Sequence, residues 1–509
     1  MTPETLARTL QDFLAESRHA VVMEEGAVVF DLESSRYSLS ADRGKCVLHL
    51  WSAERNTVRR VLDAELKSDV LRLSVQRLGQ TRPTCLEVCR SRDRRSPSAK
   101  KAARAAYEQL LRRVITREFP GCKLDKLSSA MDLERSFGPI YTRGLLRHGN
   151  SVFALMGVNA QELQPSIDAA LTFAILWFDL ARQNATRTFV EGLKLFVPAG
   201  TSAVVRERMA HLDRGAAKWM LYELDERAGA VQEIDTADRG NIATRLVHCP
   251  DREAARQRFA ASIARVLSIC REAELAVLSP VEISFRLCGL EFARARATPV
   301  PSSFRHGEEI VVGVGAEETV LDEHNAEQFA ASVAHLRHSR QPRPNRQDAL
   351  WRLCPERWLE SLVIRDVAAL DARLNPAWVY SQVPAFSASD RAMIDVLITT
   401  ADGRLAVVEL KADEDIHLPL QGLDYWARVV WHQQRGEFQR FGYFPGSHLS
   451  AEPPLLLLVA PALHVHPTTD TLLRYISPEI ECELAGIDEH WRQGVRVIFR
   501  KRKEKSAAD

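Results

Sequence analysis

The spacing of apolar and polar positions predicts α/β structure, most clearly between residues 393 and 434. Met393–Thr399 and Leu405–Leu410 are short apolar runs, which are typical of buried strands. Asp402-Gly403 lies between them and is a strong signal for a hairpin turn. The apolar positions of Leu420–Gln434 recur with helical spacing. This stretch therefore predicts a hairpin of two strands followed by a helix.

The same order of elements occurs twice in the chain. In the C-terminal part we expect helices at 356–370, 420–434 and 468–475, and strands at 379–386, 393–399, 405–410, 455–459, 482–486 and 495–500. In an earlier part we expect helices at 98–119, 163–182 and 202–212, and strands at 151–158, 191–197 and 218–224. Elements in this order predict an α/β (α+β) fold in which a mixed sheet is flanked by helices.

Charged residues gather where the second strand of the hairpin ends. Glu409 and Lys411 are two positions apart, so they project from the same face of the strand, and the hairpin brings Asp395 beside Glu409. Two carboxylates this close are unfavourable unless a cation shares them, and Mg²⁺ prefers such oxygen ligands. A neighbouring lysine can position a water or stabilise charge on a phosphate. These residue types indicate phosphodiester hydrolysis, with a surface hairpin carrying an ion pair as the alternative.

The same residues carry a family resemblance. Asp395 followed by Glu409-Leu410-Lys411 resembles the signature of the PD-(D/E)XK nuclease superfamily, which has the restriction-endonuclease-like fold. Gln421-Gly-Leu-Asp-Tyr425 resembles the Q-x-x-x-Y helix motif of its RecB-like branch. The residue before Asp395 is isoleucine rather than the proline of the superfamily's name. The resemblance covers the last third of the chain.

The resemblance implies an endo- or exonuclease that depends on Mg²⁺ or Mn²⁺. Asp395, Glu409 and the Leu410 carbonyl would hold the metal, and Lys411 would position or activate the attacking water. In the helix motif, Gln421 and Tyr425 would orient the lysine and contact the nucleic acid.

A glutamate on the first helix often completes the metal site in this superfamily. Glu356 and Glu360 lie four residues apart and therefore share a helix face. We expect Glu360 to be the further metal ligand, because Val363 and Ile364 place it on the inward, apolar side of the helix.

The repeated order of elements predicts an internal duplication. Asp395 falls on Arg143 at a spacing of 395 − 143 = 252, and Pro461 falls on Pro198 at a spacing of 461 − 198 = 263. At the spacing of 252, the earlier part lacks the reactive residues of the C-terminal part. Glu409, Lys411 and Gln421 correspond there to Gly157, Asn159 and Ala169. The earlier copy should therefore bind no metal. The alternative is that the two parts are unrelated, because any two α/β units with the same order of elements can be aligned in this way.

These patterns divide the chain into four expected domains. They are an N-terminal α/β domain at 1–97, a degenerate nuclease-like domain at 98–248, an α/β connecting domain and linker at 249–350, and a nuclease domain at 351–509. The connecting domain is expected to contain a long strand at Val281–Ala297.

Composition and charge limit the class of protein. Lys and Arg number 68 against 67 for Asp and Glu, so a nucleic-acid contact requires a local basic surface. Candidates are Arg92, Arg94 and Arg95; Arg112 and Arg113; Arg294 and Arg296; and Arg500, Lys501, Arg502 and Lys503. The nine cysteines contain no C-x-x-C pair, and no apolar run reaches the length of a membrane span, so we expect a reduced, cytoplasmic protein with no membrane partner.

The family resemblance together with the local chemistry favours DNA as the substrate over RNA, with a homo-oligomer or a protein partner left open. The alternative function is a non-catalytic scaffold that uses nuclease-like folds to bind nucleic acid or protein. The chain contains no G-x-x-x-x-G-K-[ST] motif, so a nucleotide-driven motor is not expected.

Overall fold

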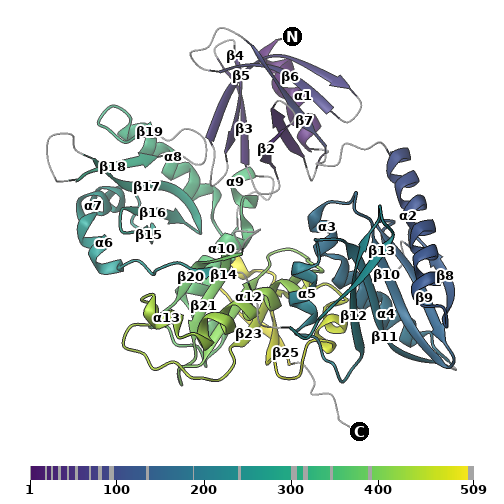
Figure 1. Ribbon diagram of the computed structural model, residues 1–509. Helices are drawn as coiled ribbons and strands as arrows, with labels where there is room; N and C mark the ends of the chain where they lie inside the picture. The colour runs from purple at the N-terminus through teal and green to yellow at the C-terminus, as the bar shows by residue number, and fades with distance from the viewer. Residues whose placement is uncertain are drawn as a thin grey trace. The chain divides into compact units, whose positions relative to one another are not determined.

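The computed structural model describes residues 2–502 except 16, 18–19, 25–26, 33–35, 43–44, 52–55, 68–69, 78–82, 91–96, 133–136, 187, 239–241, 243, 300–305, 313–318, 344–347 and 388–392. Within these residues the expected mixed α+β class is confirmed, because the strands form four sheets that are flanked by helices (Figure 1). The chain divides into two compact units: unit 1 holds residues 1–97, 252–287 and 291–335, and unit 2 holds 98–251, 288–290 and 336–509.

Unit 1 contains two sheets. The strands of the first are β1 (Val21–Glu24), β2 (Ala27–Asp31), β3 (Arg36–Asp42), β4 (Lys45–Trp51), β5 (Asn56–Lys67), β6 (Val70–Arg77) and β7 (Thr84–Cys89), in the order β2-β1-β7-β6-β5-β4-β3, and α1 (Pro3–Ala15) packs on them. The strands of the second are β15 (Glu274–Ser279), β16 (Glu282–Leu287), β17 (Leu290–Pro299), β18 (His306–Val312) and β19 (Thr319–Val320), accompanied by α6 (Arg252–Arg258), α7 (Ala260–Ile269) and α8 (Ala326–Ser339).

The expected long strand at Val281–Ala297 is wrong, because the chain turns back in its middle. Strands β16 and β17 are separated by Cys288 and Gly289, whose φ angles are 47° and 74°. A Cβ atom on Gly289 would lie 2.0 Å from the carbonyl oxygen of Arg357, so only glycine fits there. The alternation of apolar residues on both sides of the turn hides it from the sequence pattern.

Unit 2 contains the two regions with the repeated element order. We call residues 98–251 its first half and residues 336–509 its second half. The first half comprises α2 (Pro97–Glu118), β8 (Lys123–Ser128), β9 (Tyr141–His148), β10 (Ser151–Val158), α3 (Gln164–Asp168), α4 (Ala170–Gln183), β11 (Phe189–Pro198), α5 (Ala203–Met209), β12 (Lys218–Asp225), β13 (Ala230–Ile234) and β14 (Thr244–Leu246).

The second half comprises α9 (Ala349–Arg352), α10 (Pro355–Arg365), α11 (Val367–Leu370), β20 (Tyr380–Ser387), β21 (Met393–Thr399), β22 (Leu405–Leu410), α12 (Leu418–Gln434), α13 (Glu437–Arg440), β23 (Leu455–Pro461), η1 (Ala462–His464), α14 (Thr469–Arg474), β24 (Cys482–Ile487), η2 (Trp491–Gln493) and β25 (Val497–Arg502). The bounds expected for β21 and β22 are confirmed at both ends.

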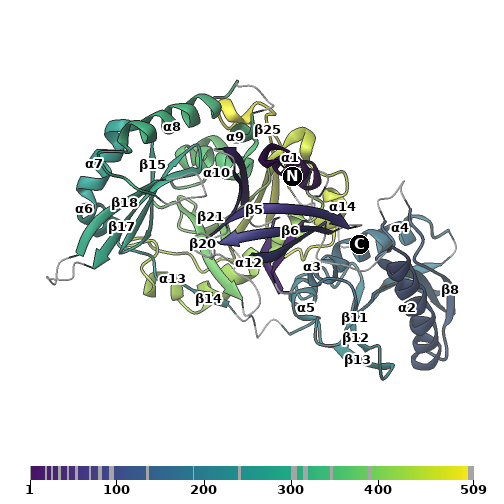
Figure 2. The same ribbon diagram turned by 90° about the horizontal axis from the view of Figure 1, so that it is seen from above.

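The two sheets of unit 2 share one topology. From β8 to β13 in one sheet, and from β20 to β25 in the other, neighbouring strands pair antiparallel, antiparallel, parallel, parallel and antiparallel. Strand β14 of the first half adds to the sheet of the second half beside β20. Each sheet is covered by helices on both faces, with α2 against the outer face of the first sheet and α10 and α11 against that of the second (Figure 2).

The inner faces of the two sheets meet in one hydrophobic core that includes α4 and α12. The short helices bridge the two halves, since α5 and α14 each pack on both α4 and α12. Arg208 on α5 forms a 2.7 Å ion pair with Asp424 on α12. Arg474 on α14 forms a 3.1 Å ion pair with Asp179 on α4, which also accepts a hydrogen bond from the Tyr475 hydroxyl. The two halves therefore fold as one body.

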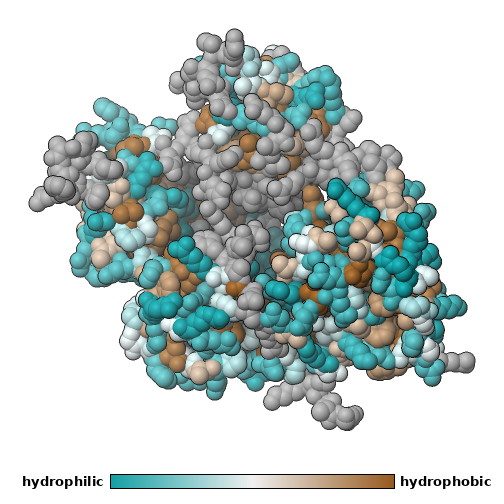
Figure 3. All heavy atoms as spheres, in the orientation of Figure 1, coloured by the Kyte–Doolittle hydropathy of each residue, from teal (hydrophilic) through white to brown (hydrophobic). Residues whose placement is uncertain are grey.

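The described residues on the face shown in Figure 3 are mainly hydrophilic. On the face shown in Figure 3, apolar residues are scattered in small groups among polar ones. Within the described part of the chain, no helix is both long enough and apolar enough to cross a membrane.

Replacing Gly403 by alanine should destabilise unit 2 more than the same change at Gly446. Both glycines have positive φ angles, 85° and 72°, so both substitutions carry the backbone cost of an alanine in that region. A Cβ atom on Gly403 would also lie 2.2 Å from the carbonyl oxygen of His448, whereas nothing lies within 4 Å at Gly446. Because of this steric clash, we expect an additional loss of about 1–3 kcal/mol at Gly403 in chemical denaturation. Equal losses would contradict this account of the hairpin turn.

Candidate active site

The candidate site lies at the end of β22, where the sheet is completely enclosed. All six residues of β22 are buried, because the strand lies between β21 and β23 and has helices on both faces. Val396 pairs with Val408 in the antiparallel hairpin, and the same register places Asp395 opposite Glu409. Residues directly opposite in such a pair have Cβ atoms about 5 Å apart. The hairpin therefore brings together the two carboxylates expected from the sequence.

Glu409 and Lys411 form a buried pair. The Lys411 Nζ atom lies 3.4 Å from Glu409 Oε1, and the exposed fractions of the two side chains are 15% and 2%. The second carboxylate oxygen, Oε2 of Glu409, is buried and has no hydrogen-bond partner among the described residues. Burial and then the charge of Asp395 raise the pKa of the Glu409 carboxyl well above its usual range, although Lys411 opposes the shift.

Lys411 remains charged because it is surrounded by carboxylates. Glu356 Oε1 lies 4.0 Å and Asp415 Oδ2 lies 3.7 Å from its Nζ atom. Burial alone would lower the pKa of the Lys411 ammonium, but these carboxylates, with Glu409 the largest contributor, raise that pKa above its usual range. Glu356 is half exposed, and burial is the first cause that raises the pKa of its carboxyl. From the first helix it is thus Glu356, rather than the expected Glu360, that approaches Lys411.

Asp395 is fixed by hydrogen bonds from two directions. Its Oδ2 atom accepts the Leu410 backbone N–H at 3.0 Å, and its Oδ1 atom accepts the Gln382 side-chain amide at 3.3 Å. The same amide nitrogen of Gln382 donates to Glu360 Oε2 at 2.8 Å, and Arg357 donates to that oxygen at 2.9 Å. Gln382 therefore links Asp395 to Glu360.

Gln382 was not identified from the sequence. It lies within β20 with a φ of 52°, which is rare for a residue other than glycine. Glutamine in a strand has no distinctive sequence signal, so only the fold shows that its amide faces the carboxylates.

The helix motif lies over the buried pair. A Cβ atom on Gly422 would be 2.5 Å from the Leu458 side chain and 3.7 Å from the Glu409 Cβ, so α12 approaches the strands closely at this point. The Oε1 atom of Gln421 is buried without a hydrogen-bond partner in the described structure. Burial, followed by the charges of Glu409 and Asp395, raises the pKa of the Tyr425 hydroxyl. Tyr425 of the motif therefore lies close enough to Glu409 and Asp395 to feel their charges.

The donor set suits a hard cation. Glu409 Oε2 and Gln421 Oε1 are buried oxygen acceptors that lack donors, and Asp395 adds a carboxylate opposite Glu409. Glu360 is engaged by Arg357 and Gln382. Among the residues that the structure describes, no group of three or more His, Cys, Asp or Glu side chains is close enough together to hold a metal ion. A cation at this site would therefore require side-chain rearrangement or ligands of other kinds, such as backbone carbonyls and waters.

The strand pairings show that the expected alignment of the second half on the first half is shifted by one residue after the hairpin. Asp395 opposes Glu409, which lies beside Leu458, and Leu458 lies beside Leu484. In the first half the equivalent positions are Arg143, Met156, Leu195 and Leu221.

Glu409 thus corresponds to Met156 rather than Gly157, and Lys411 corresponds to Val158 rather than Asn159. Gly157 faces the opposite side of its sheet, toward Tyr107 of α2. The error arises because the loop of the second hairpin is one residue longer. The pairing of Asp395 with Arg143 is unchanged, so the first half carries an arginine, a methionine and a valine at the reactive positions.

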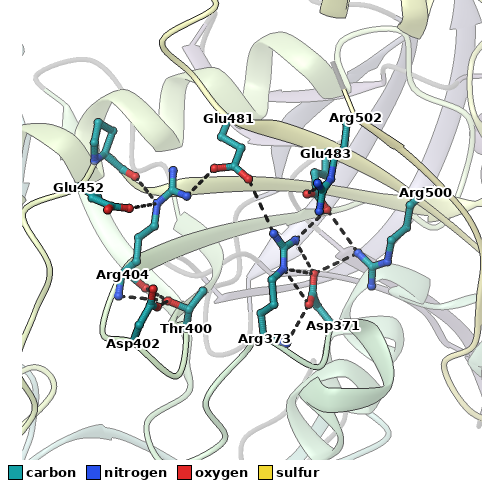
Figure 4. Close-up of polar contacts among 11 residues, drawn as sticks. Asp371, Arg373, Thr400, Asp402, Arg404, Glu452, Glu481, Glu483, Arg500 and Arg502 are labelled. Carbon is teal, nitrogen blue, oxygen red and sulfur yellow. Dashed lines mark hydrogen bonds and ion pairs between the residues drawn. The ribbon is translucent and has the colours of Figure 1, made fainter. Parts of the chain in front are cut away.

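The basic clusters expected to contact nucleic acid are largely neutralised. Arg294 pairs with Glu282 and Glu291, and Arg296 pairs with Glu309. Figure 4 shows the buried Glu483 among the guanidinium groups of Arg373, Arg500 and Arg502. Lys501 pairs with Asp470. Arg92, Arg94, Arg95 and Lys503 lie outside the described residues.

Comparison of the chain with protein-family models, with curated proteins and with solved structures finds no match.

Proposed function

We propose that this protein is a metal-dependent nuclease whose active site is formed by the end of β22 in the second half of unit 2. The observation that carries the proposal is the buried Glu409–Lys411 pair opposite Asp395, with an oxygen of Glu409 left without a donor. A buried carboxylate oxygen without a donor is unusual, and a bound cation would satisfy it. The resemblance to the PD-(D/E)XK superfamily and its Q-x-x-x-Y motif supports the same assignment.

The residues take the following roles. Asp395 and Glu409 would hold the metal, with the Leu410 carbonyl as the neighbouring backbone ligand. When bound, Mg²⁺ or Mn²⁺ supplies Lewis-acid stabilisation of charge on the phosphate. Lys411 positions the attacking water and holds positive charge beside the scissile phosphate. Gln421 and Tyr425 orient the lysine from α12.

Glu360 has an additional role that follows from its contacts. It is tied to Asp395 through the Gln382 amide, so it orients Asp395 whether or not it contacts the metal itself. Glu356, at 4.0 Å from Lys411, is a second candidate for the carboxylate from the first helix.

We also propose that the two halves of unit 2 arose by duplication of a restriction-endonuclease-like core. The shared strand order and strand directions, and the equivalent packing of α5 and α14 on both α4 and α12, support this origin. The first half would then be a degenerate copy, because Arg143, Met156 and Val158 occupy its reactive positions.

The proposal is tested by incubating the full-length chain with plasmid DNA, single-stranded DNA and RNA, in Mg²⁺, in Mn²⁺ and in EDTA. We expect cleavage of DNA in either metal and none in EDTA, because without the metal no Lewis acid would stabilise the charge that develops on the phosphate. Binding of nucleic acid without cleavage of any substrate would contradict the proposal and support the non-catalytic scaffold.

A further inference from the structure

A cavity of about 930 Å³ lies directly beside the candidate active site. Its wall includes Ala412 and Asp413, which follow Lys411, and Pro355, which precedes Glu356. Its volume is within the range of sites that enclose a small organic molecule. A ligand in this cavity would therefore be adjacent to the residues proposed to cut a phosphodiester bond.

The cavity is lined by a stacked aromatic and guanidinium layer. The Arg492 guanidinium lies 3.9 Å from the ring centre of Trp351 and 4.1 Å from that of Trp491. Trp491 is buried and meets Trp358 edge to face at 6.3 Å, which holds the layer in place. Flat aromatic and guanidinium surfaces of this kind stack well on nucleobases.

The charges of the cavity suit a polyanion. Arg343 and Arg352 also line it, and neither forms an ion pair with any residue that the structure describes. Of the two lining carboxylates, Glu489 is already engaged by His464 at 3.5 Å. This differs from the clusters at Arg294 and Arg500, where carboxylates neutralise the arginines.

We propose that this cavity binds an unpaired nucleotide of the strand that is cut, with its base stacked on the Arg492 layer and its phosphate held by Arg343 and Arg352. The substrate would then be single-stranded DNA or a duplex whose end is frayed. The inference rests on the proposed nuclease function, since it takes the adjacent site as the place of cleavage. A cavity of about 930 Å³ has room for a single nucleotide but not for a base-paired duplex, so it would select for unpaired strands.

The test measures binding without cleavage. Full-length Glu409→Gln protein in EDTA is titrated into fluorescein-labelled single-stranded DNA, a blunt DNA hairpin and single-stranded RNA of the same sequence, and Kd is read from anisotropy at fixed salt. Adding Arg492→Gln should raise Kd for single-stranded DNA about tenfold and change Kd for the blunt hairpin much less. Adding Arg352→Gln, at an exposed position outside the stack, should weaken single-strand binding and reduce its salt dependence.

Arg435→Gln is the matched control, because Arg435 also stacks on a tryptophan, Trp431, but lies at the far end of α12. It should leave Kd unchanged. Unchanged binding in both Arg492→Gln and Arg352→Gln, or equal losses for hairpin and single strand, would overturn the cavity assignment while leaving the nuclease proposal intact. Tighter or equal binding of RNA would overturn the choice of DNA. Absence of metal-dependent cleavage by the wild-type protein would instead overturn the nuclease proposal.

Discussion

Glu409→Gln should reduce cleavage at least about a thousandfold, the order of effect expected when an electrostatic group is removed from a reacting phosphate. The same change should make the metal-free protein more stable at neutral pH. Because the pKa of Glu409 is raised above its ordinary value of 4.5, the folded chain keeps a proton that the unfolded chain has already released. Stability of the wild type therefore falls as the pH rises from about 4.5 towards the raised pKa. Glutamine removes that dependence.

The measurement combines initial cleavage rates with chemical denaturation in EDTA between pH 4 and pH 9. Glu483→Gln is the matched control, because Glu483 is also fully buried and lies two strands away in the same sheet. It is surrounded by arginines, so its replacement should lower stability and leave the rate per folded molecule unchanged. If Glu409→Gln lost stability as Glu483→Gln does, or kept its activity, Glu409 would be a structural residue.

Arg208→Met should destabilise unit 2 by about 3–5 kcal/mol, the usual cost of removing one partner of a buried ion pair. Arg208 and Asp424 are largely buried, with exposed side-chain fractions of 9% and 16%. Arg208 donates to both oxygens of Asp424 and to the Asp168 carbonyl. Its loss would leave Asp424 beside Glu207, whose carboxyl pKa is already raised by burial and by Asp424.

Denaturant unfolding of the single and double variants measures this effect. Arg208→Met combined with Asp424→Leu should recover much of the loss, because no unpaired charge is left in the core. Arg474→Met is the control, since Arg474 also joins the two halves but is 61% exposed, and surface pairs contribute about 1 kcal/mol or less. A loss below about 1 kcal/mol in Arg208→Met would show that α12 is not held by this pair.

Features encoded by neighbouring residues could be predicted from the sequence. The bounds of β21 and β22 follow from their apolar runs, and the hairpin follows from Asp402-Gly403, because both signals are local. The approach of Asp395, Glu409 and Lys411 then follows from the pairing of two adjacent strands.

Features that depend on distant residues could not be predicted. Gln382 reaches Asp395 only because β20 pairs with β21, and its positive φ has no sequence signal. The residue-by-residue alignment of the two halves is also hard to predict, because one hairpin loop is a residue longer than the other. The spacing of apolar residues contains no sign of that extra residue. The basic run at Arg500 looked like a nucleic-acid contact because its acidic partners, Asp371 and Glu483, are remote in sequence or on another strand.

The bridging of the two halves by α5 and α14 limits how the chain can be divided. Leu195 of the first half and Leu458 of the second belong to the same core, so a fragment beginning at residue 351 would present a bare apolar face to water. Such a fragment should aggregate even though it carries every proposed catalytic residue. The first half is thus needed whether or not it has chemistry of its own, because it covers the apolar inner face of the second half.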